Sequence, residues 1–249
     1  QTLMKYCAIV PCYRHASTLD SVLTRLAKYS LPVIVVDDGN DIENATIIEK
    51  TVNSHNLANE RVTLLKHDIN QGKGGSVTTG LKYAYKAGFT HAVQVDSDGQ
   101  HCIEDMDKIL KLSKDNEDCV ISGMPVYDAN APRSRVIGRK ITNFFVHVET
   151  LSSMIKDAMI GFRVYPLEKT VSVINKSHIG SRMNFDIEVL VRLVWNGVRV
   201  KFFETRVDYP KGGISNFKPI DNVKISLMHT KLCCISVLTL PVRIFKNAR

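Results

Sequence analysis

The stretch HAVQVDSDGQH, residues 91–101, decides how the rest of this chain is interpreted. Its first half is a short apolar run rich in Val, which is typical of a buried strand. Its second half places Asp96, Asp98 and Gln100 on a turn that contains Gly99. Carboxylates one residue apart repel each other unless a cation or a strong donor lies between them, and Mg²⁺ and Mn²⁺ take such oxygen ligands. The stretch predicts either a divalent-metal site after a strand or a solvated acidic turn. It does not fit an EF-hand loop, which needs Gly at its sixth position, whereas Gly99 is fourth.

Length and composition limit the class of protein. The chain has 249 residues, which is long enough for one large α/β domain or two small ones, and with 44% hydrophobic and 23% charged residues we expect it to be folded rather than disordered. The net charge of +8 favours an anionic partner: a phosphate-bearing substrate, nucleic acid or an acidic membrane surface. The six cysteines form no C-x-x-C pair and no zinc pattern, which favours reduced packing residues in a cytosolic protein over disulfides. We expect no signal peptide, and no apolar run reaches the roughly 18 residues of a membrane span.

Strand and helix patterns alternate along the first half of the chain. We expect strands at 6–10, 32–36 and 61–66, a fourth at the start of 91–101 and a fifth at 118–122, with helices at 17–28, 43–57 and 75–87. Ser17 is the expected cap of the first helix, and Pro11 the expected end of the first strand. Further on we expect a basic helix over 132–155, a strand after 161–163, a helix at 184–195 and strands at 198–203 and 205–209. This order predicts a mostly parallel sheet with helices on both faces, whose ligands bind at the carboxyl ends of the strands.

The carboxyl-terminal part of the chain has a different character. We treat residues 1–220 as one domain and 221–249 as an extension, with a candidate mobile loop at 210–219. The extension mixes apolar residues with cations and carries Asp221 as its one acid; the cations are Lys224, Lys231, Arg243, Lys246 and Arg249. This composition predicts either contact with an anionic membrane surface or a helix packed on the domain's own core.

Two more polar loops are expected at the same edge of the sheet. Asp37 and Asp38 follow the second strand, where a carboxylate can accept hydrogen bonds from a nucleobase or a ribose hydroxyl, although Asp-Asp-Gly is also a common turn. The loop 70–76, NQGKGGS, can offer backbone N–H groups and Lys73 to an anion. It matches neither the Walker A loop nor the dinucleotide fingerprint.

Five short motifs, taken together and in this order, resemble family 2 glycosyltransferases with the GT-A fold. They are PCY at 11–13, VDDG at 36–39, NQGKGGS at 70–76, VDSDGQH at 95–101 and GFR at 161–163. The resemblance covers about residues 5–215 and is closest to the branch that includes dolichyl-phosphate mannose synthase and the polyprenyl-phosphate glycosyltransferases. It implies transfer of a sugar from a nucleoside-diphosphate donor, with no nucleic-acid partner.

The resemblance also implies roles on the donor side. Asp37 resembles the acidic residue that contacts the nucleobase, with Pro11 and Tyr13 lining the same pocket. Asp38, Lys73 and His101 are further candidate substrate-binding residues. Asp96, Asp98 and Gln100 resemble the ligands of Mg²⁺ or Mn²⁺ on the diphosphate, where the ion acts as a Lewis acid for the leaving group.

On the acceptor side, Arg135, Arg139 and Arg163 resemble basic residues that surround phosphates, and Asp98 and Arg163 are candidate catalytic residues beside Asp157. An acceptor that is a lipid phosphate is already anionic and needs no general base. A hydroxyl acceptor needs one, and Asp157, with Glu188 second, is the candidate; Asp157 paired with Arg163 in a structural role is the alternative. Members of this kind invert the anomeric carbon in a single displacement.

Our leading hypothesis is therefore a metal-dependent inverting glycosyltransferase that acts on a lipid-linked, phosphate-bearing acceptor, peripheral at the inner face of the cytoplasmic membrane. The alternatives are a related enzyme with a hydroxyl acceptor, a nucleotidyltransferase and a non-catalytic nucleotide-binding module. The non-catalytic reading predicts erosion of the metal loop, and the loop is intact.

Overall fold

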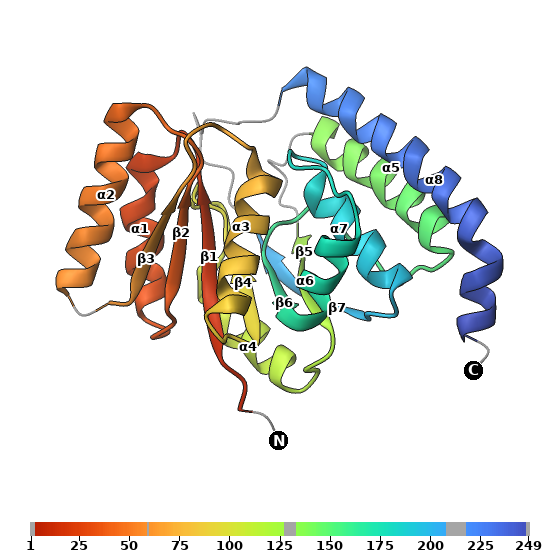
Figure 1. Cartoon of the computed structure of the whole chain (residues 1–249), viewed down its shortest axis with the longest axis horizontal. Helices are drawn as coiled ribbons and strands as arrows, with labels where there is room; N and C mark the ends of the chain where they lie inside the picture. The colour runs from red at the N-terminus through yellow and green to blue at the C-terminus, as the bar shows by residue number, and fades with distance from the viewer. Residues whose placement is uncertain (1–2, 59, 127–132, 208–217, 248–249) are drawn as a thin grey trace.

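The computed structural model describes residues 3–58, 60–126, 133–207 and 218–247, with the backbone alone at 133–135 and 241–247. The described residues form a seven-stranded sheet in the order β3-β2-β1-β4-β6-β5-β7 (Figure 1). Its strands are β1 Tyr6–Cys12, β2 Val33–Asp37, β3 Val62–Lys66, β4 His91–Gln94, β5 Val120–Val126, β6 Arg163–Pro166 and β7 Val200–Arg206. Nearly all of the expected mobile loop at 210–219 lies outside the described residues.

The sheet is mixed, with one strand reversed. β1 pairs in parallel with β2 and β4, β2 with β3, and β5 with β7, whereas β6 runs antiparallel to both β4 and β5. The predicted mostly parallel α/β sheet is confirmed, and the reversal of β6 is the feature that strand alternation does not predict. The carboxyl ends of β1, β2 and β4 lie next to one another at one edge.

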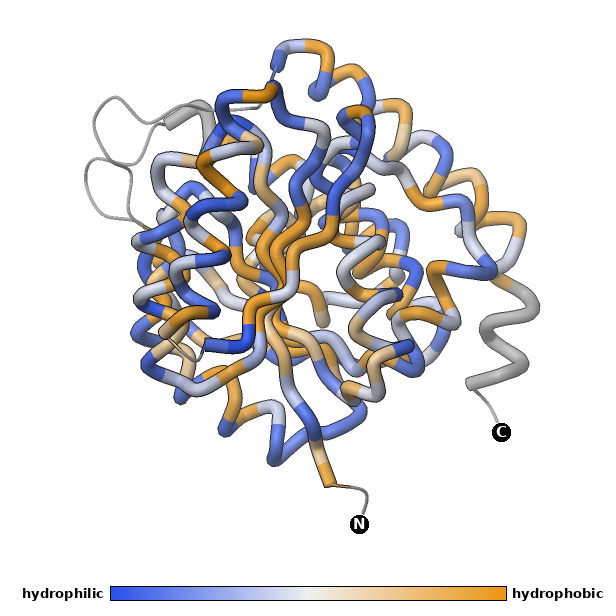
Figure 2. The backbone as a smooth tube through the Cα atoms, turned by 60° about the vertical axis from the view of Figure 1, so that its left-hand side comes forward, coloured by the Kyte–Doolittle hydropathy of each residue, from blue (hydrophilic) through white to orange (hydrophobic). Residues whose placement is uncertain are grey.

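Helices cover both faces of the sheet. They are α1 Ala16–Ala27, α2 Ile42–Leu57, α3 Lys73–Lys86, α4 Met106–Lys114, α5 Arg133–Thr150, α6 Leu167–Lys176, α7 Phe185–Trp195 and α8 Pro219–Asn247, with a short 3₁₀ turn at Ile103–Asp105. Successive residues of a strand point to opposite faces, so Ala8 and Val10 pack with α1 whereas Cys7 and Ile9 pack with α3. Both faces are therefore buried, which explains why the central strands are apolar throughout, as Figure 2 shows in orange.

Several predicted boundaries are wrong. β1 continues through Pro11 to Cys12, because β4 has stopped pairing with β1 beyond Ile9 and a proline without an N–H is tolerated where one side of the strand is unpaired. α1 begins at Ala16, and its N-cap residue His15 makes no side-chain cap, so Ser17 lies inside the helix. Over the described part of 198–209, the two expected strands are the single strand β7, which pairs with β5 over its whole length, whereas residues 208 and 209 lie outside the described residues. The helices α4 and α6 are not among the predicted elements.

The helix α8 packs on the domain through one face. Its residues Ile225, Met228 and Leu232 belong to the core beneath α5 and α7. The stretch Pro219–Leu240 is also long and apolar enough to cross a membrane by length and composition, with 28% of its apolar window buried. The prediction of a helix packed on the domain's own core is thus confirmed for the inner face. Membrane contact by its outer face, and a domain boundary at residue 220, stay predictions.

The cysteine thiols give a first testable expectation. All six are free, and burial raises the pKa of both Cys7 and Cys12 to about 12, whereas Cys234 is exposed. Because the thiolate is the reactive form, we expect iodoacetamide at neutral pH to label Cys234 in the folded protein and to reach Cys7 and Cys12 only after unfolding. Peptide mass spectrometry measures this, and labelling of Cys12 as fast as Cys234 would contradict the packing described.

Candidate active site

The end of β2 holds the first predicted site residue in a fixed direction. Asp37 lies opposite Cys12 in the register of β1 and β2 and is buried. Its carboxylate accepts hydrogen bonds from the backbone N–H of Asn40 at 3.1 Å and from Asn40 Nδ2 at 2.7 Å. Pro11 and the half-buried Tyr13 belong to the neighbouring strand end. The structure therefore brings Asp37, Pro11 and Tyr13 to adjacent strand ends, as the sequence predicts for parallel neighbours.

Asp38 makes different contacts from Asp37. One carboxylate oxygen accepts from the backbone N–H of Gln71 at 2.9 Å and meets His67 Nδ1 at 2.8 Å. The other accepts from Asn70 Nδ2 and from the backbone N–H of Gly72, both at 2.8 Å. Both oxygens are thus used in holding the loop that leads into α3. We predicted Asp38 as a substrate-binding residue, but these contacts make it a residue that positions the loop.

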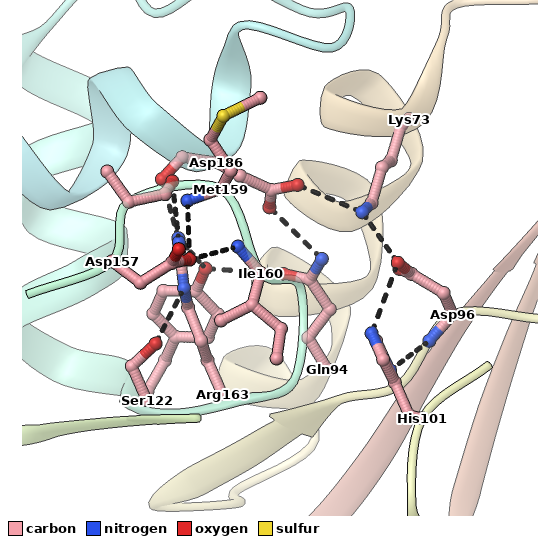
Figure 3. Close-up of polar contacts among 12 residues, drawn as sticks. Lys73, Gln94, Asp96, His101, Ser122, Asp157, Met159, Ile160, Arg163 and Asp186 are labelled. Atoms are coloured by element: carbon pink, nitrogen blue, oxygen red, sulfur yellow. Dashed lines mark hydrogen bonds and ion pairs between the residues drawn. The ribbon is translucent and has the colours of Figure 1, made fainter. Parts of the chain in front are cut away.

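Lys73 joins two carboxylates at the start of α3 (Figure 3). Its Nζ lies 2.8 Å from Asp96 Oδ2 and 2.9 Å from Asp186 Oδ2. Burial opposes the charge of Lys73, but the two carboxylates outweigh burial and raise its pKa. Burial would likewise raise the pKa of Asp96, yet Lys73 and His101 hold that pKa at about 2. Lys73 and Asp96 are therefore a charged pair in the folded protein.

Asp186, in the first turn of α7, was not among the predicted site residues. Besides Lys73, its carboxylate accepts a hydrogen bond from Gln94 Nε2 at 3.1 Å, and Gln94 Oε1 accepts in turn from the hydroxyl of Tyr165 at 3.2 Å. The network links α3, β4, β6 and α7. Asp186 ends the stretch SRMNFD at 181–186, which lies within the residues that the family resemblance covers, and this position was the one signal in the sequence.

Gly161 explains why the GFR motif begins with glycine. A Cβ atom at this position would lie 2.8 Å from Lys73 Nζ, 2.8 Å from Gln94 Nε2 and 2.9 Å from Asp96 Oδ1. Those distances are too short for a carbon atom, so any side chain would push the charged pair apart. The close approach of this backbone fixes the wall of the site beside Asp96.

His101 orients Asp96. The backbone N–H of Asp96 donates to His101 Nδ1 at 3.2 Å, so that nitrogen carries no proton in this arrangement and Nε2 is the protonated one. His101 Nε2 lies 3.5 Å from Asp96 Oδ2, and the ring stacks on Phe162 with centroids 5.5 Å apart. His101 is thus buried beside Asp96 and also contributes to the lining of the pocket that the carboxylates share.

A small pocket of about 70 Å³ lies in front of these carboxylates. Its lining includes Asp96, Asp98, Gln100 and Arg139. Asp98 is half-exposed and accepts a hydrogen bond from the backbone N–H of Gln100 at 3.0 Å. The three predicted metal ligands and one predicted phosphate-binding arginine therefore share one pocket.

The oxygen ligands at this pocket suit a divalent ion. Asp96 Oδ1 is buried and has no hydrogen-bond partner among the described residues, as expected of an oxygen that binds a cation. Over the described residues, no group of three or more His, Cys, Asp or Glu could hold a metal. Two carboxylates and the Gln100 amide suit Mg²⁺ or Mn²⁺, because such ions complete their shell with substrate phosphates and water.

Asp157 and Arg139 form a buried ion pair on the other side of the pocket. Arg139 Nη1 donates to both oxygens of Asp157, each at 2.8 Å. Asp157 Oδ1 also accepts from the backbone N–H groups of Met159 at 3.0 Å and Ile160 at 2.9 Å. The carboxylate is therefore structural in this conformation, as in the alternative interpretation, but its partner is Arg139 instead of Arg163.

Arg163 does not reach the pocket. Its side chain is fully buried and donates to the carbonyl oxygens of Asp186 at 2.5 Å and Ala158 at 2.8 Å, and to Ser122 Oγ at 3.2 Å (Figure 3). We predicted Arg163 as a catalytic residue, but its hydrogen bonds make it a structural residue that connects β5, β6 and α7. The side chain of Arg135 lies outside the described part of α5.

Glu188, the second candidate base, is also fully engaged. Its carboxylate accepts hydrogen bonds from Arg192 Nη2 at 2.7 Å and from the backbone N–H of Gly180 at 3.0 Å, and it lies 3.2 Å from Lys231 Nζ. It lines a different pocket, beside α8. Neither candidate base therefore offers a carboxylate oxygen to the pocket at Asp96.

The mixed sheet with helices on both faces is the GT-A fold. Glucosyl-3-phosphoglycerate synthase from Mycobacterium tuberculosis, solved with Mn²⁺, UDP and glucosyl-3-phosphoglycerate, superposes with a TM-score of 0.63 at 12% identity over 95% of this chain and 79% of that one. The S. aureus protein TarS, residues 1–349 solved with UDP, gives a TM-score of 0.60 at 18% identity over 94% of this chain and 66% of that one. At these identities the likeness shows the fold.

The chain belongs to glycosyl transferase family 2, whose family model matches residues 7–170, and it is a glycosyltransferase. It is 25% identical over 222 residues to the polyprenol monophosphomannose synthase of Mycolicibacterium smegmatis, covering 84% of this chain and 82% of that enzyme. It is 28% identical over 143 residues to the UDP-N-acetylglucosamine–dolichyl-phosphate N-acetylglucosaminyltransferase of Methanococcus voltae, with 52% of this chain and 57% of that enzyme covered. A dolichyl-phosphate β-glucosyltransferase of Dictyostelium discoideum is 28% identical over 201 residues, with 73% of this chain and 60% of that enzyme covered.

Proposed function

We propose that this glycosyltransferase moves a sugar from a nucleoside-diphosphate donor to a lipid-linked phosphate, with inversion and with Mg²⁺ or Mn²⁺ bound. The observation that carries the proposal is the pocket in which Asp96, Asp98 and Gln100 face Arg139. It joins oxygen ligands for a cation to a guanidinium that suits phosphate. The names of the relatives, which act on dolichyl or polyprenyl phosphates, support the same acceptor class.

On the donor side, the buried Asp37 carboxylate would accept hydrogen bonds from the base, with Tyr13 beside it. Asp96, Asp98 and Gln100 would hold the ion, which supplies Lewis-acid stabilisation of the leaving diphosphate. Lys73 keeps Asp96 ionised and fixed by a contact of 2.8 Å. His101, behind Asp96, holds the same carboxylate in its direction.

On the acceptor side, the contacts of the two candidate bases favour an acceptor that is already ionised when it binds. Asp157 is held by Arg139 and two backbone N–H groups, and Glu188 by Arg192 and Lys231. Neither is placed to take a proton at the pocket, as a hydroxyl acceptor would require. A phosphate monoester is anionic near neutral pH, so orientation by arginine suffices and one displacement inverts the anomeric carbon. The hydroxyl-acceptor alternative requires Asp157 to leave Arg139.

A comparison of matched acceptors tests this proposal. The protein is incubated with UDP- and GDP-sugars and Mn²⁺, together with either a polyprenyl phosphate or the corresponding polyprenol. We expect the glycosylated lipid to form at least about 100-fold faster from the phosphate than from the alcohol, because neither candidate base among the described residues, Asp157 or Glu188, is placed to take a proton at the pocket. Chelation of the metal should stop turnover. Equal turnover with the polyprenol would contradict the acceptor assignment, and turnover in excess EDTA would contradict the metal.

We place the enzyme at the inner face of the cytoplasmic membrane as a peripheral protein, since a lipid-linked acceptor lies there while nucleotide sugars are in the cytosol. The apolar, basic character of residues 221–249 supports this location.

A further inference from the structure

Two neighbouring helices, α5 and α8, carry apolar side chains on their outward faces. On α5 these residues recur every three or four positions, so they form one stripe: Ile137, Ile141, Phe144, Phe145, Val148 and, just past the end, Leu151. Phe144 is 64% exposed and Leu151 62%. The opposite face of α5, with Val146 and Glu149, is buried in the domain.

The helix α8 repeats this arrangement. Its buried residues Ile225, Met228 and Leu232 make one stripe against the domain. On the far side of the helix lies a second apolar stripe, whose members include Val223 at 52% exposure, Leu227 at 65%, Val237 at 72% and Leu238 at 79%. A helix that only packs on its own domain needs one such stripe. The second stripe requires another explanation.

The two stripes belong to one surface. α5 and α8 lie side by side in Figure 1, and Figure 2 shows apolar segments recurring along α8. Phe145 stacks on His229 with ring centroids 5.2 Å apart, and His229 Nδ1 lies 2.6 Å from Glu149 Oε1. These contacts hold α5 and α8 together on the side that faces the domain, so the two apolar stripes lie on the outer side. We call the outward stripes of the two helices the α5–α8 face.

The charges around this face have one sign. The only acids within α5 and α8 are Glu149 and Asp221, and both are buried. Among the side chains that the structure describes, the exposed cations of the two helices are Lys140, Lys224 and Lys231, whereas Arg139 is paired with Asp157. A second copy docking through the same face would set cations against cations with no acid of these helices to pair them. An anionic lipid surface satisfies both the charge and the apolar area.

A pocket beside α8 adds a place for phosphate head groups. Its volume is about 330 Å³, and Lys224, Lys231, Arg182 and Leu227 contribute to its lining. Leu227 also belongs to the α5–α8 face, so the pocket opens at the rim of that face. Glu188, its one acid, is held by Arg192 and Lys231. Cations at the rim of an apolar stripe are the arrangement of helices that lie in a membrane interface.

We propose that the α5–α8 face docks on an anionic bilayer, with both helices lying in the plane of the interface. The inference deepens the proposed lipid-linked acceptor: α5 also carries Arg139, which lines the candidate active site, so docking holds that pocket at the level of the head groups. α8 is long enough to cross a membrane, but its inner face packs along the domain, which keeps it parallel to the surface.

Vesicle binding by the full chain tests the docking surface. Sucrose-loaded vesicles of phosphatidylcholine, with or without phosphatidylglycerol, are sedimented with the wild type and with two double variants, Leu227→Gln/Leu238→Gln and Ile141→Gln/Phe144→Gln. We expect each double variant to bind the anionic vesicles at least about tenfold more weakly, because two apolar side chains leave the lipid contact. Neutral vesicles should bind the wild type weakly.

The matched control is Ile42→Gln/Leu57→Gln on α2, at the opposite end of the molecule in Figure 1, where the two side chains are 88% and 87% exposed. This control should bind like the wild type. No binding of wild type to anionic vesicles, or equal binding by all variants, would overturn the proposal. So would a wild-type dimer that the α5–α8 variants dissociate without any vesicle binding.

The assay contains no sugar nucleotide, so its outcome is separate from that of the proposed reaction. Transfer to a short-chain, detergent-soluble polyprenyl phosphate should stay intact in the double variants. Loss of vesicle binding with transfer retained supports the docking surface, whereas binding retained in every variant together with active transfer removes the surface and leaves the proposed function.

Discussion

An Asp98→Ala variant is expected to lose about 100- to 1000-fold in metal-dependent sugar transfer while it keeps its fold. Asp98 is half-exposed at the pocket, and its carboxylate accepts one hydrogen bond from the backbone, that of Gln100. The loss of such a bond costs about 1 kcal/mol of folding free energy, which a domain of this size tolerates. The carboxylate's larger role is to balance the charge of the ion on the donor diphosphate, so removal acts on catalysis.

Two measurements separate that role from a general defect. Calorimetry of a nucleoside diphosphate with and without Mn²⁺ should show that the variant keeps the metal-independent part of binding and loses the increment that Mn²⁺ adds. Asp107→Ala, at an exposed carboxylate in the first turn of α4, is the matched control and should behave as the wild type. Full activity of Asp98→Ala would remove Asp98 from the metal site.

The predictable part of the site is the part made by parallel strands. Asp37 ends β2, Asp96 follows β4 and Lys73 follows the loop after β3, and parallel neighbours must bring such residues to one edge. Their order along the chain and their residue types were therefore enough to group them. The same reasoning placed Asp98 and Gln100 beside Asp96, because the three share one turn.

Residues that act across the fold could not be predicted in the same way. Arg163 was recognised by its motif, but whether its side chain points to the pocket or into the domain depends on the reversed direction of β6, which no local pattern encodes. Asp186 reaches Lys73 only because α7 packs on α3. The sequence allowed an ion pair between Asp157 and Arg163, but tertiary packing places Arg139 beside Asp157 instead.

The structure also changes how the carboxyl-terminal extension should be tested. Truncation after Asp221 would remove Ile225, Met228 and Leu232 from the core and so damage the fold along with any lipid contact. Substitutions confined to the outward stripe avoid this difficulty, because those side chains are solvent-exposed.

The largest stability effect is expected from Lys73→Met. The substitution keeps the length and the apolar stem of the side chain but removes the ammonium between Asp96 Oδ2, at 2.8 Å, and Asp186 Oδ2, at 2.9 Å. Asp186 is buried, and two neighbouring carboxylates would then face each other without a cation. Breaking a buried ion pair by removing one partner costs about 3–5 kcal/mol, so the urea midpoint should fall clearly.

The stability lost in Lys73→Met should depend on pH in a defined direction. The pKa of Asp96 is lowered to about 2 in the folded protein from an ordinary value of 3.8, so its contribution to stability is present above pH 3.8 and disappears as the pH falls toward 2. Lys73→Met removes the main source of positive charge on Asp96, so the difference in unfolding free energy between wild type and variant should be largest near neutral pH and shrink on acidification. Urea titrations between pH 7 and the acid limit of folding measure it.

Two further variants decide whether the effect belongs to the carboxylate pair. Lys86→Met makes the same change at the exposed end of the same helix and should alter the unfolding free energy by less than about 0.5 kcal/mol. Lys73→Met/Asp186→Asn removes one of the two stranded charges, so the double variant should be more stable than Lys73→Met alone, with a coupling energy of about 1–3 kcal/mol in the double-mutant cycle. The cycle also needs the single variant Asp186→Asn. If the losses of unfolding free energy in Lys73→Met and Asp186→Asn simply add up to the loss in the double variant, Lys73 does not stabilise the fold through Asp186, and the ion pair between α3 and α7 has no energetic role.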